Sequence, residues 1–321
     1  CIRDSYGEVD VANLPPECVS EVRDMINKTP RFTVGTTELS VDAVALQYRV
    51  ETETSLAQEL AALVADIPLA DPLSQKLMEF SFGMRLGALR DFLRNKMAAI
   101  EADPYQCEHL ADLNNSATEA FATLNQPMPP LINNFRGIRA SLNRFSPGGD
   151  LVNDSRGMIA VHVEKPQMFV GAAQMFLPGM EELPLEPGAD PVRLPQTMIP
   201  TPDMVAYAAI SDDAIALSLG EGEQDGLLTY MARSASNDGT FLSTSYDLSS
   251  YLNMTQGLSD RMKDMRDDMS QPDPETNGPE QSFLRIGEAT EKVIMDIADR
   301  NHLTMRFTAD GFVADTRMTF K

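Results

Sequence analysis

Residues 138–143, with the sequence IRASLN, alternate apolar and polar side chains along the chain. A period of two places successive side chains on opposite faces of a strand, so this stretch predicts a β-strand with one buried face. Apolar runs at residues 158–163 and 168–176, separated by the sequence EKP, are also typical of strands. From about Asn134 onward, the sequence therefore predicts an antiparallel sheet.

Two hairpins extend this expectation toward the C-terminus. Residues 205–210 and 214–219 are joined by the turn sequence SDD, and residues 302–308 and 312–320 by a turn with Asp310 and Gly311. Helices are expected at residues 223–233, 249–269 and 283–300. Seven prolines fall between residues 178 and 202. They predict an irregular surface loop, because proline removes a backbone donor.

The first 130 residues read as mainly helical. Residues 55–66, 73–100 and 105–124 repeat apolar side chains at intervals of three and four, as amphipathic helices do. Residues 31–50 are ambiguous, and their end, 44–50, alternates weakly like a strand.

The fold class expected is α+β, an antiparallel sheet covered on one face by helices and preceded by a mainly helical N-terminal region. The expected domains are a tether at 1–20, a helical region at 21–132 and the sheet with its helices at 133–321. The last two could form one continuous domain.

The net charge of −22 and the isoelectric point of about 4.4 limit the partners of the protein. Phosphate binding needs clustered Lys and Arg, so this charge argues against nucleic acid as a partner. The same charge opposes docking flat on anionic lipid. Acidity is also a common route to solubility, and we favour that interpretation.

Cys1 at the first position resembles the acylated cysteine of processed bacterial lipoproteins, although a fragment could begin there by chance. The resemblance implies a lipid anchor on an otherwise water-exposed body, because no apolar run approaches the ~18 residues of a spanning helix. Ile2 replaces the aspartate that retains many such proteins in the inner membrane. This favours the outer membrane, with the body in the periplasm.

The remaining cysteines, Cys18 and Cys107, are expected to form a disulfide. Two alternatives stay open. Both could be buried thiols, or Cys18 could pair with Cys1.

Methionine is unusually abundant, with 19 residues and no tryptophan. A stripe on the expected helix 249–269 has three interpretations: a core-facing stripe, a flexible surface for a hydrophobic ligand or partner helix, or a copper(I) site of thioether ligands. Met175 and Met180 could extend either kind of site. The stripe is Met254, Leu258, Met262, Met265 and Met269.

No catalytic or cofactor motif is persuasive. The sequence GEGEQDG at 220–226 misses the dinucleotide spacing and carries acids that would repel a pyrophosphate. The start of a calcium loop at 273–278 lacks its terminal glutamate, since Leu284 stands there. His109, His162 and His302 lie in unrelated contexts without paired metal-ligand spacing. We therefore expect no cofactor and no metal.

The function expected is that of a non-enzymatic envelope lipoprotein. It would bind another envelope protein or a hydrophobic ligand through the proline loop and the methionine-bearing helix. Two alternatives remain: an envelope hydrolase or metal-dependent enzyme assembled from residues distant in sequence, and a periplasmic copper-binding protein.

Overall fold

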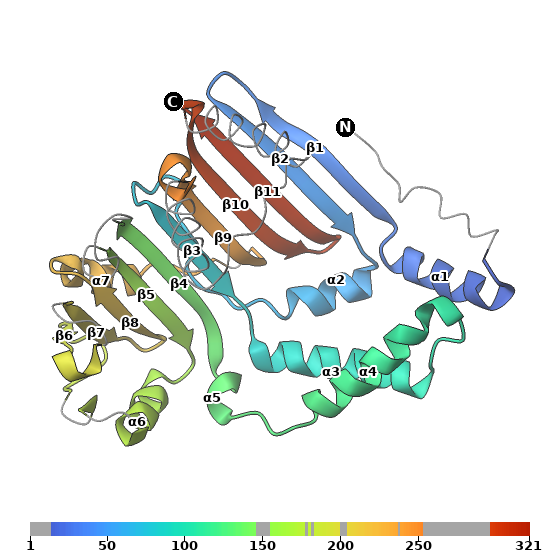
Figure 1. Cartoon of the computed structure of the whole chain (residues 1–321), viewed down its shortest axis with the longest axis horizontal. Helices are drawn as coiled ribbons and strands as arrows, with labels where there is room; N and C mark the ends of the chain where they lie inside the picture. The colour runs from blue at the N-terminus through green and yellow to red at the C-terminus, as the bar shows by residue number, and fades with distance from the viewer. Residues whose placement is uncertain are drawn as a thin grey trace, which may run out of the picture.

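The computed structural model describes residues 14–145, 155–176, 179–180, 183–199, 204–236, 238–252 and 296–321. Its strands form one sheet (Figure 1). They are β1 (Arg31–Leu39), β2 (Ala43–Glu51), β3 (Met78–Gly83), β4 (Phe135–Arg144), β5 (Arg156–Val163), β6 (Val192–Arg193), β7 (Ala206–Ile210), β8 (Ala214–Leu219), β9 (Thr240–Asp247), β10 (Ala298–Thr308) and β11 (Gly311–Phe320).

Helices join several of these strands. They are α1 (Pro16–Lys28), α2 (Thr54–Ala61), α3 (Leu86–Ala102), α4 (Ala111–Leu124), α5 (Pro130–Asn133), α6 (Pro166–Phe176) and α7 (Leu227–Met231). Short 3-10 turns are η2 (Glu108–Leu110), η4 (Gln196–Met198) and η5 (Glu223–Gly226). The expected α+β class with an antiparallel sheet is confirmed.

Among the described residues, the sheet has eleven strands, in the order β1-β2-β11-β10-β9-β3-β4-β5-β8-β7-β6. Every strand pair is antiparallel. The β1–β2 hairpin is extended by β11, so the first strands of the chain pair with the last one. Strand β3 lies between β9 and β4, near the middle of the sheet.

The expectation that the first 130 residues are mainly helical was partly wrong, because strands β1, β2 and β3 lie there. Residues 73–100 were expected as one helix, but β3 occupies Met78–Gly83 and α3 begins only at Leu86. The sequence MEFSFG alternates large apolar side chains with Glu79, Ser81 and Gly83. This short period of two was masked by the helical spacing of the residues that follow.

Two further expectations also need correction, and one strand was missed. Residues 168–176 were expected as a strand but belong to helix α6, which begins at Pro166. Proline at the first turn of a helix costs no hydrogen bond, so it marks the start of α6. Strand β9 was not anticipated. The expected helix 283–300 is wrong at its end, because Ala298 starts β10, while residues 283–295 lie outside the described residues.

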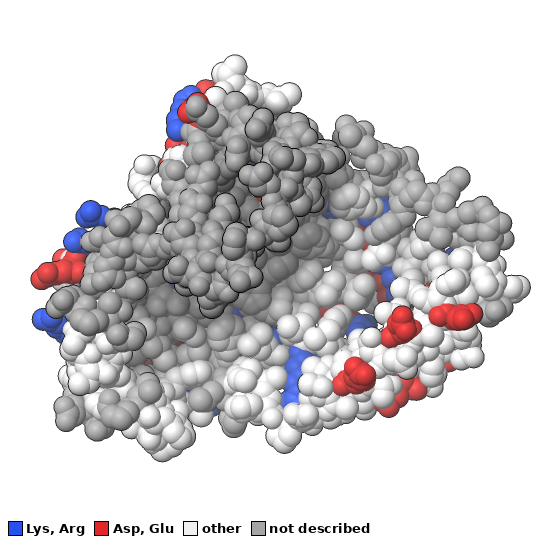
Figure 2. All heavy atoms as spheres, in the orientation of Figure 1, with Lys and Arg blue, Asp and Glu red and all other residues white. Residues whose placement is uncertain are grey.

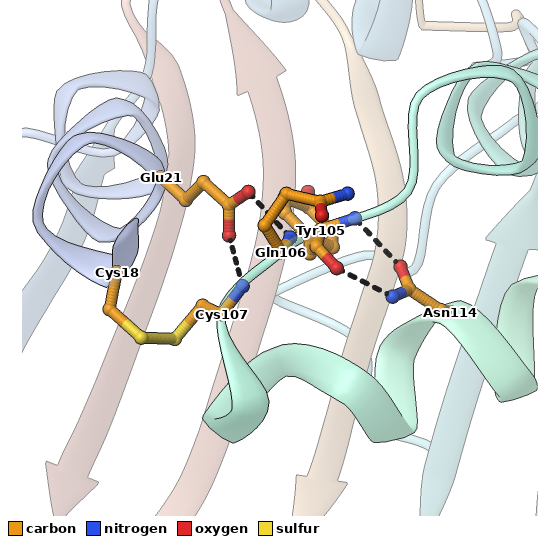
Figure 3. Close-up of a disulfide and its surroundings, with 6 residues drawn as sticks. All are labelled: Cys18, Glu21, Tyr105, Gln106, Cys107 and Asn114. Carbon is orange, nitrogen blue, oxygen red and sulfur yellow. Dashed lines mark hydrogen bonds between the residues drawn. A yellow bond between two sulfur atoms is a disulfide. The ribbon is translucent and has the colours of Figure 1, made fainter. Parts of the chain in front are cut away.

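Helices α3 and α4 pack side by side at one end of the strands (Figure 1). The expected disulfide between Cys18 and Cys107 is present, with an S–S distance of 2.07 Å, and it ties α1 to the segment before η2 (Figure 3). The Glu21 carboxylate accepts hydrogen bonds from the backbone N–H groups of Gln106 (2.7 Å) and Cys107 (3.0 Å). The same contact is therefore held by a covalent and a polar link.

The two faces of the sheet differ in chemistry. Paired residues of neighbouring antiparallel strands lie on the same face, so the register defines each face. Ser81 pairs with Arg139 of β4 and with Ser243 of β9. Phe80 pairs with Ala140 of β4 and with Thr244 of β9. One face of the central strands therefore carries polar side chains, and the other carries mainly apolar ones.

Candidate ligand-binding face

The central strands bury their polar face. Glu79 is 2% exposed, Arg139 is 1% exposed and Ser243 is fully buried. An extended segment crosses this face, because the backbone N–H of Ala70 donates to Ser243 Oγ (2.7 Å) and Ser81 Oγ donates to the Pro68 carbonyl (2.8 Å). The backbone of this segment thus covers part of the polar face and pairs with the hydroxyl groups of Ser81 and Ser243.

Charged side chains on this face are paired. Glu79 accepts a hydrogen bond from the backbone N–H of Asp71 (2.8 Å), and its carboxylate lies 3.1 Å from Lys76 Nζ and 3.5 Å from Arg233. Arg139 donates from Nη1 to the Tyr230 carbonyl (2.7 Å) on α7. A buried charge with such partners holds the covering segments in one arrangement.

Burial changes the proton affinities of two groups on this face. Burial raises the pKa of Tyr230 to about 12. It lowers the pKa of His162 to about 4, and the nearby positive charge of Arg139 adds to this lowering. His302 on β10 likewise has a pKa below its usual value because of burial. Both histidines are therefore neutral at neutral pH, and each packs as part of the sheet.

The opposite face of β3, β4, β5 and β8 carries only hydrocarbon and thioether side chains, and we call this set the apolar face. None of its members is buried, and Leu217 and Leu219 are 37% and 38% exposed. The apolar face consists of Met78, Phe80, Phe82, Ile138, Ala140, Leu142, Ile159, Val161, Ile215, Leu217 and Leu219.

This arrangement reverses the usual pattern of a one-sided antiparallel sheet, in which the apolar face is buried and the polar face meets water. Here Glu79 and Ser81 are buried, while Phe80 and Phe82 between them are only partly buried. Apolar side chains that lie together on one sheet face and keep part of their surface accessible can form a binding surface. The apolar face is therefore the candidate functional site.

The apolar face continues toward β10 and β11. Phe241 stacks on Phe307, with ring centroids 4.7 Å apart, and Phe312 lies 6.1 Å from Phe307. Tyr246 contacts Tyr251, at 4.7 Å between ring centroids, and Tyr251 also borders a small cleft with Met78 and Leu142. Aromatic side chains thus border the apolar face on its β9 side.

At the other end, α6 and the proline-rich segment cover the sheet. Ile210 on β7 is 1% exposed and packs with Val170 of α6 and with Met180 and Leu183. The proline-rich loop, expected to lie across the surface as a contact element, thus contributes buried side chains to the core. The members of the apolar face on β3, β4 and β5 are partly exposed, whereas Ile210 on β7 is buried.

The sequence-predicted site residues are dispersed. Met180 is buried against Ile210, whereas Met175 at the end of α6 is 75% exposed. Cys1, Met254, Leu258, Met262, Met265 and Met269 lie outside the described residues. Within the described part of the chain, no three His, Cys, Asp or Glu side chains gather as metal ligands would. The structure thus gives the site to residues that sequence reasoning did not select.

Sequence reasoning missed the apolar face because β3 was read as helix. The available signal was the alternation in MEFSFG, which places Met78, Phe80 and Phe82 on one side. Ile138 and Leu142 had been recognised as one face of a strand, but the pattern alone assigned that face to the core.

The fold and the partly exposed apolar face define a class of protein: an α+β protein built on one antiparallel sheet, with apolar side chains on one face of its central strands. Comparison of the chain with family models, with curated protein sequences and with solved structures finds no match. Among the described residues, no helix is both long and apolar enough to cross a bilayer.

Proposed function

We propose that the protein is a non-enzymatic binding protein that holds the hydrocarbon chain of a lipid-like ligand on the apolar face. The observation that carries this proposal is the partial exposure of Phe80, Ile138 and Leu217, while Glu79 and Arg139 on the opposite face are buried. Each buried CH₂ of a ligand would contribute about 0.8 kcal/mol to binding.

The chemistry of the face favours a hydrocarbon chain over a protein partner. Protein interfaces combine an apolar centre with polar side chains and about one hydrogen bond per 100–200 Å². The apolar face offers no side-chain donor or acceptor on β3, β4, β5 or β8. A hydrocarbon chain needs none, because its binding energy comes from removal from water.

The dimensions of the face also suit an acyl chain. Strands of six residues such as β3 and β8 extend about 20 Å, at roughly 3.3 Å per residue. Half of a bilayer's hydrocarbon core is about 15 Å thick, which sets the scale of a lipid chain. One chain laid along two strands would therefore lie within the face.

We propose that the expected helical cover belongs mainly to the polar face, although α6 packs against Ile210 and Ile215 on the other face. Arg139 binds the backbone of α7, and α2 lies against β10 and β11.

We also propose that the protein works in the bacterial envelope, attached through Cys1 to the outer membrane with its body in the periplasm. The Cys18–Cys107 disulfide supports an oxidising compartment. Intact mass measurement of native protein tests this location. An acyl adduct on Cys1 supports it, and an unmodified Cys1 contradicts the anchor.

Fluorescence titration with N-phenyl-1-naphthylamine, a neutral apolar probe, tests the binding function. The double variant Phe80→Gln and Ile138→Gln introduces amide groups at the centre of the apolar face. We expect its affinity to fall at least tenfold, since a bound ring would leave those amides without water.

The matched control is Val41→Gln, because Val41 is 90% exposed at the tip of the β1–β2 hairpin, far from the face in the chain's pairing order. This variant should bind the probe like the wild type. Equal affinity in all three proteins, or no binding to the wild type, would contradict the proposed function.

A further inference from the structure

A polar pocket of about 330 Å³ lies where α3 begins and where β4 and β5 meet it. Residues of the strand ends and of the first turn of the helix form its wall, so it is distinct from the apolar face. The lining residues are Arg85, Gly87, Ala88, Asn133, Phe135, Arg136 and Glu164.

Two guanidinium groups and one carboxylate line this pocket. Arg136 is paired with Glu164. Arg85 has no ion-pair partner among the described residues, and its buried Nε atom finds no hydrogen-bond partner there. The pocket therefore has one positive charge in excess, on a chain whose net charge is −22.

The wall of the pocket adds backbone donors to these charges. Gly87 and Ala88 belong to the first turn of α3, where N–H groups lack partners within the helix, and that turn contains no acidic side chain. Asn133 approaches Gly87 so closely that a Cβ on Gly87 would lie 3.1 Å from Asn133 Oδ1. Glycine at this position keeps the first turn open to the pocket.

Arginine forks and unpaired backbone N–H groups both match the oxygens of a carboxylate or phosphate. We propose that this pocket binds an oxyanion group, held by the guanidinium groups of Arg85 and Arg136. The group could belong to a free anion or to the head of an amphiphile, and the two sources share this chemistry.

Calorimetric titration of the full chain at low ionic strength tests the pocket with inorganic phosphate and with oleate, and with oleyl alcohol as the uncharged counterpart of oleate. We expect phosphate or oleate to bind, and Arg85→Gln and Arg136→Gln each to weaken that binding at least fivefold. Arg85→Lys keeps the charge without the fork and should lie between wild type and Arg85→Gln.

The Glu164→Gln variant should change the anion affinity in the opposite direction to the arginine variants. It removes the internal competitor for Arg136, so anion affinity should rise about threefold or more, which a loss of structure would not produce. Arg94→Gln is the control, because Arg94 lies on the same helix, pairs with Asp91 and does not line the pocket. Its anion affinity should equal that of the wild type.

The titrations with phosphate and with oleate distinguish the two sources of the anion. Phosphate binding that depends on Arg85 identifies a free-anion site, whereas oleate binding that depends on Arg85 without phosphate binding identifies an amphiphile head. Oleyl alcohol affinity should not change in either arginine variant. The inference is overturned if no anion binds, or if anion affinity is equal in wild type, Arg85→Gln and Glu164→Gln. Neither outcome affects binding of the neutral probe to the apolar face.

Discussion

The guanidinium of Arg139 lies 4.2 Å from the ring centre of Tyr230 and donates a 2.7 Å hydrogen bond to the carbonyl of the same residue. Lys76 Nζ lies 4.9 Å from the same ring. Two cations therefore contact the Tyr230 ring: Arg139 of β4 and Lys76, which precedes β3. These contacts fix α7 over the polar face. This contact helps the sheet to bury its polar side.

Arg139→Leu should destabilise the protein by about 2–4 kcal/mol. The change removes the cation above Tyr230, leaves its buried carbonyl without this donor, and unbalances the charge of Glu79. Urea unfolding measures the effect. Arg94→Leu, at a partly exposed position with one surface ion pair, should change the free energy of unfolding by less than about 1 kcal/mol. Equal effects of the two changes would contradict the role given to Arg139.

Protonation of His162 should destabilise the fold in acid. Burial lowers its folded-state pKa from 6.5 to about 4, so the neutral form is favoured by folding. This stability is present above the unfolded-state pKa and is lost as pH falls from about 6.5 to about 4, at most about 3 kcal/mol.

The measurement is urea unfolding of wild type and His162→Leu across that pH range. The variant should lose less stability between pH 6.5 and 5, where most carboxylates remain ionised. Parallel pH profiles in the two proteins would show that His162 does not carry this dependence.

Loss of the disulfide should cost about 3–5 kcal/mol, because the bond closes a separation of 89 residues. Cys18→Ser with Cys107→Ser removes it, and reducing agent should lower the stability of the wild type but not of this variant. The hydrogen bonds of Glu21 to Gln106 and Cys107 remain, so α1 should stay docked in native conditions. A variant as stable as the oxidised wild type would contradict this estimate.

Two glycine substitutions should have opposite effects. Gly311 has φ +130°, and a Cβ there would lie 2.2 Å from the Val50 carbonyl oxygen, so Gly311→Ala should cost more than about 2 kcal/mol. Gly171 lies in helix α6, and a Cβ there meets nothing within 4 Å. Gly171→Ala should stabilise by up to about 1 kcal/mol. Thermal unfolding distinguishes them, and two losses of equal size would contradict this difference.

The sequence predicted the hairpins β7–β8 and β10–β11 because their turns and alternation are local signals. It misjudged α6, whose apolar residues lie all round and gave no helical period over so short a run. Apolar runs of this length do not distinguish a buried strand from a helix. Pro166 was the signal that could have marked a helix start.

The residues that form the candidate site are brought together by the order of the strands in the sheet. Sequence periodicity does not predict that order. Phe80 and Ile138 become neighbours only because β3 pairs with β4 across α3 and α4. Alternation shows that a strand has two different faces, but not which face is covered. That choice follows from long-range bonds such as that of Ala70 to Ser243, which bring the chain over the polar side.

Photolabelling tests the central claim most directly. A hexadecanol carrying a diazirine in mid-chain would be bound to the native full chain and irradiated, and the labelled peptides would be located by mass spectrometry. We predict labels on β3, β4, β5 and β8, at the members of the apolar face. Labels concentrated instead on other exposed apolar side chains, such as Val41 and Phe176, would contradict the account.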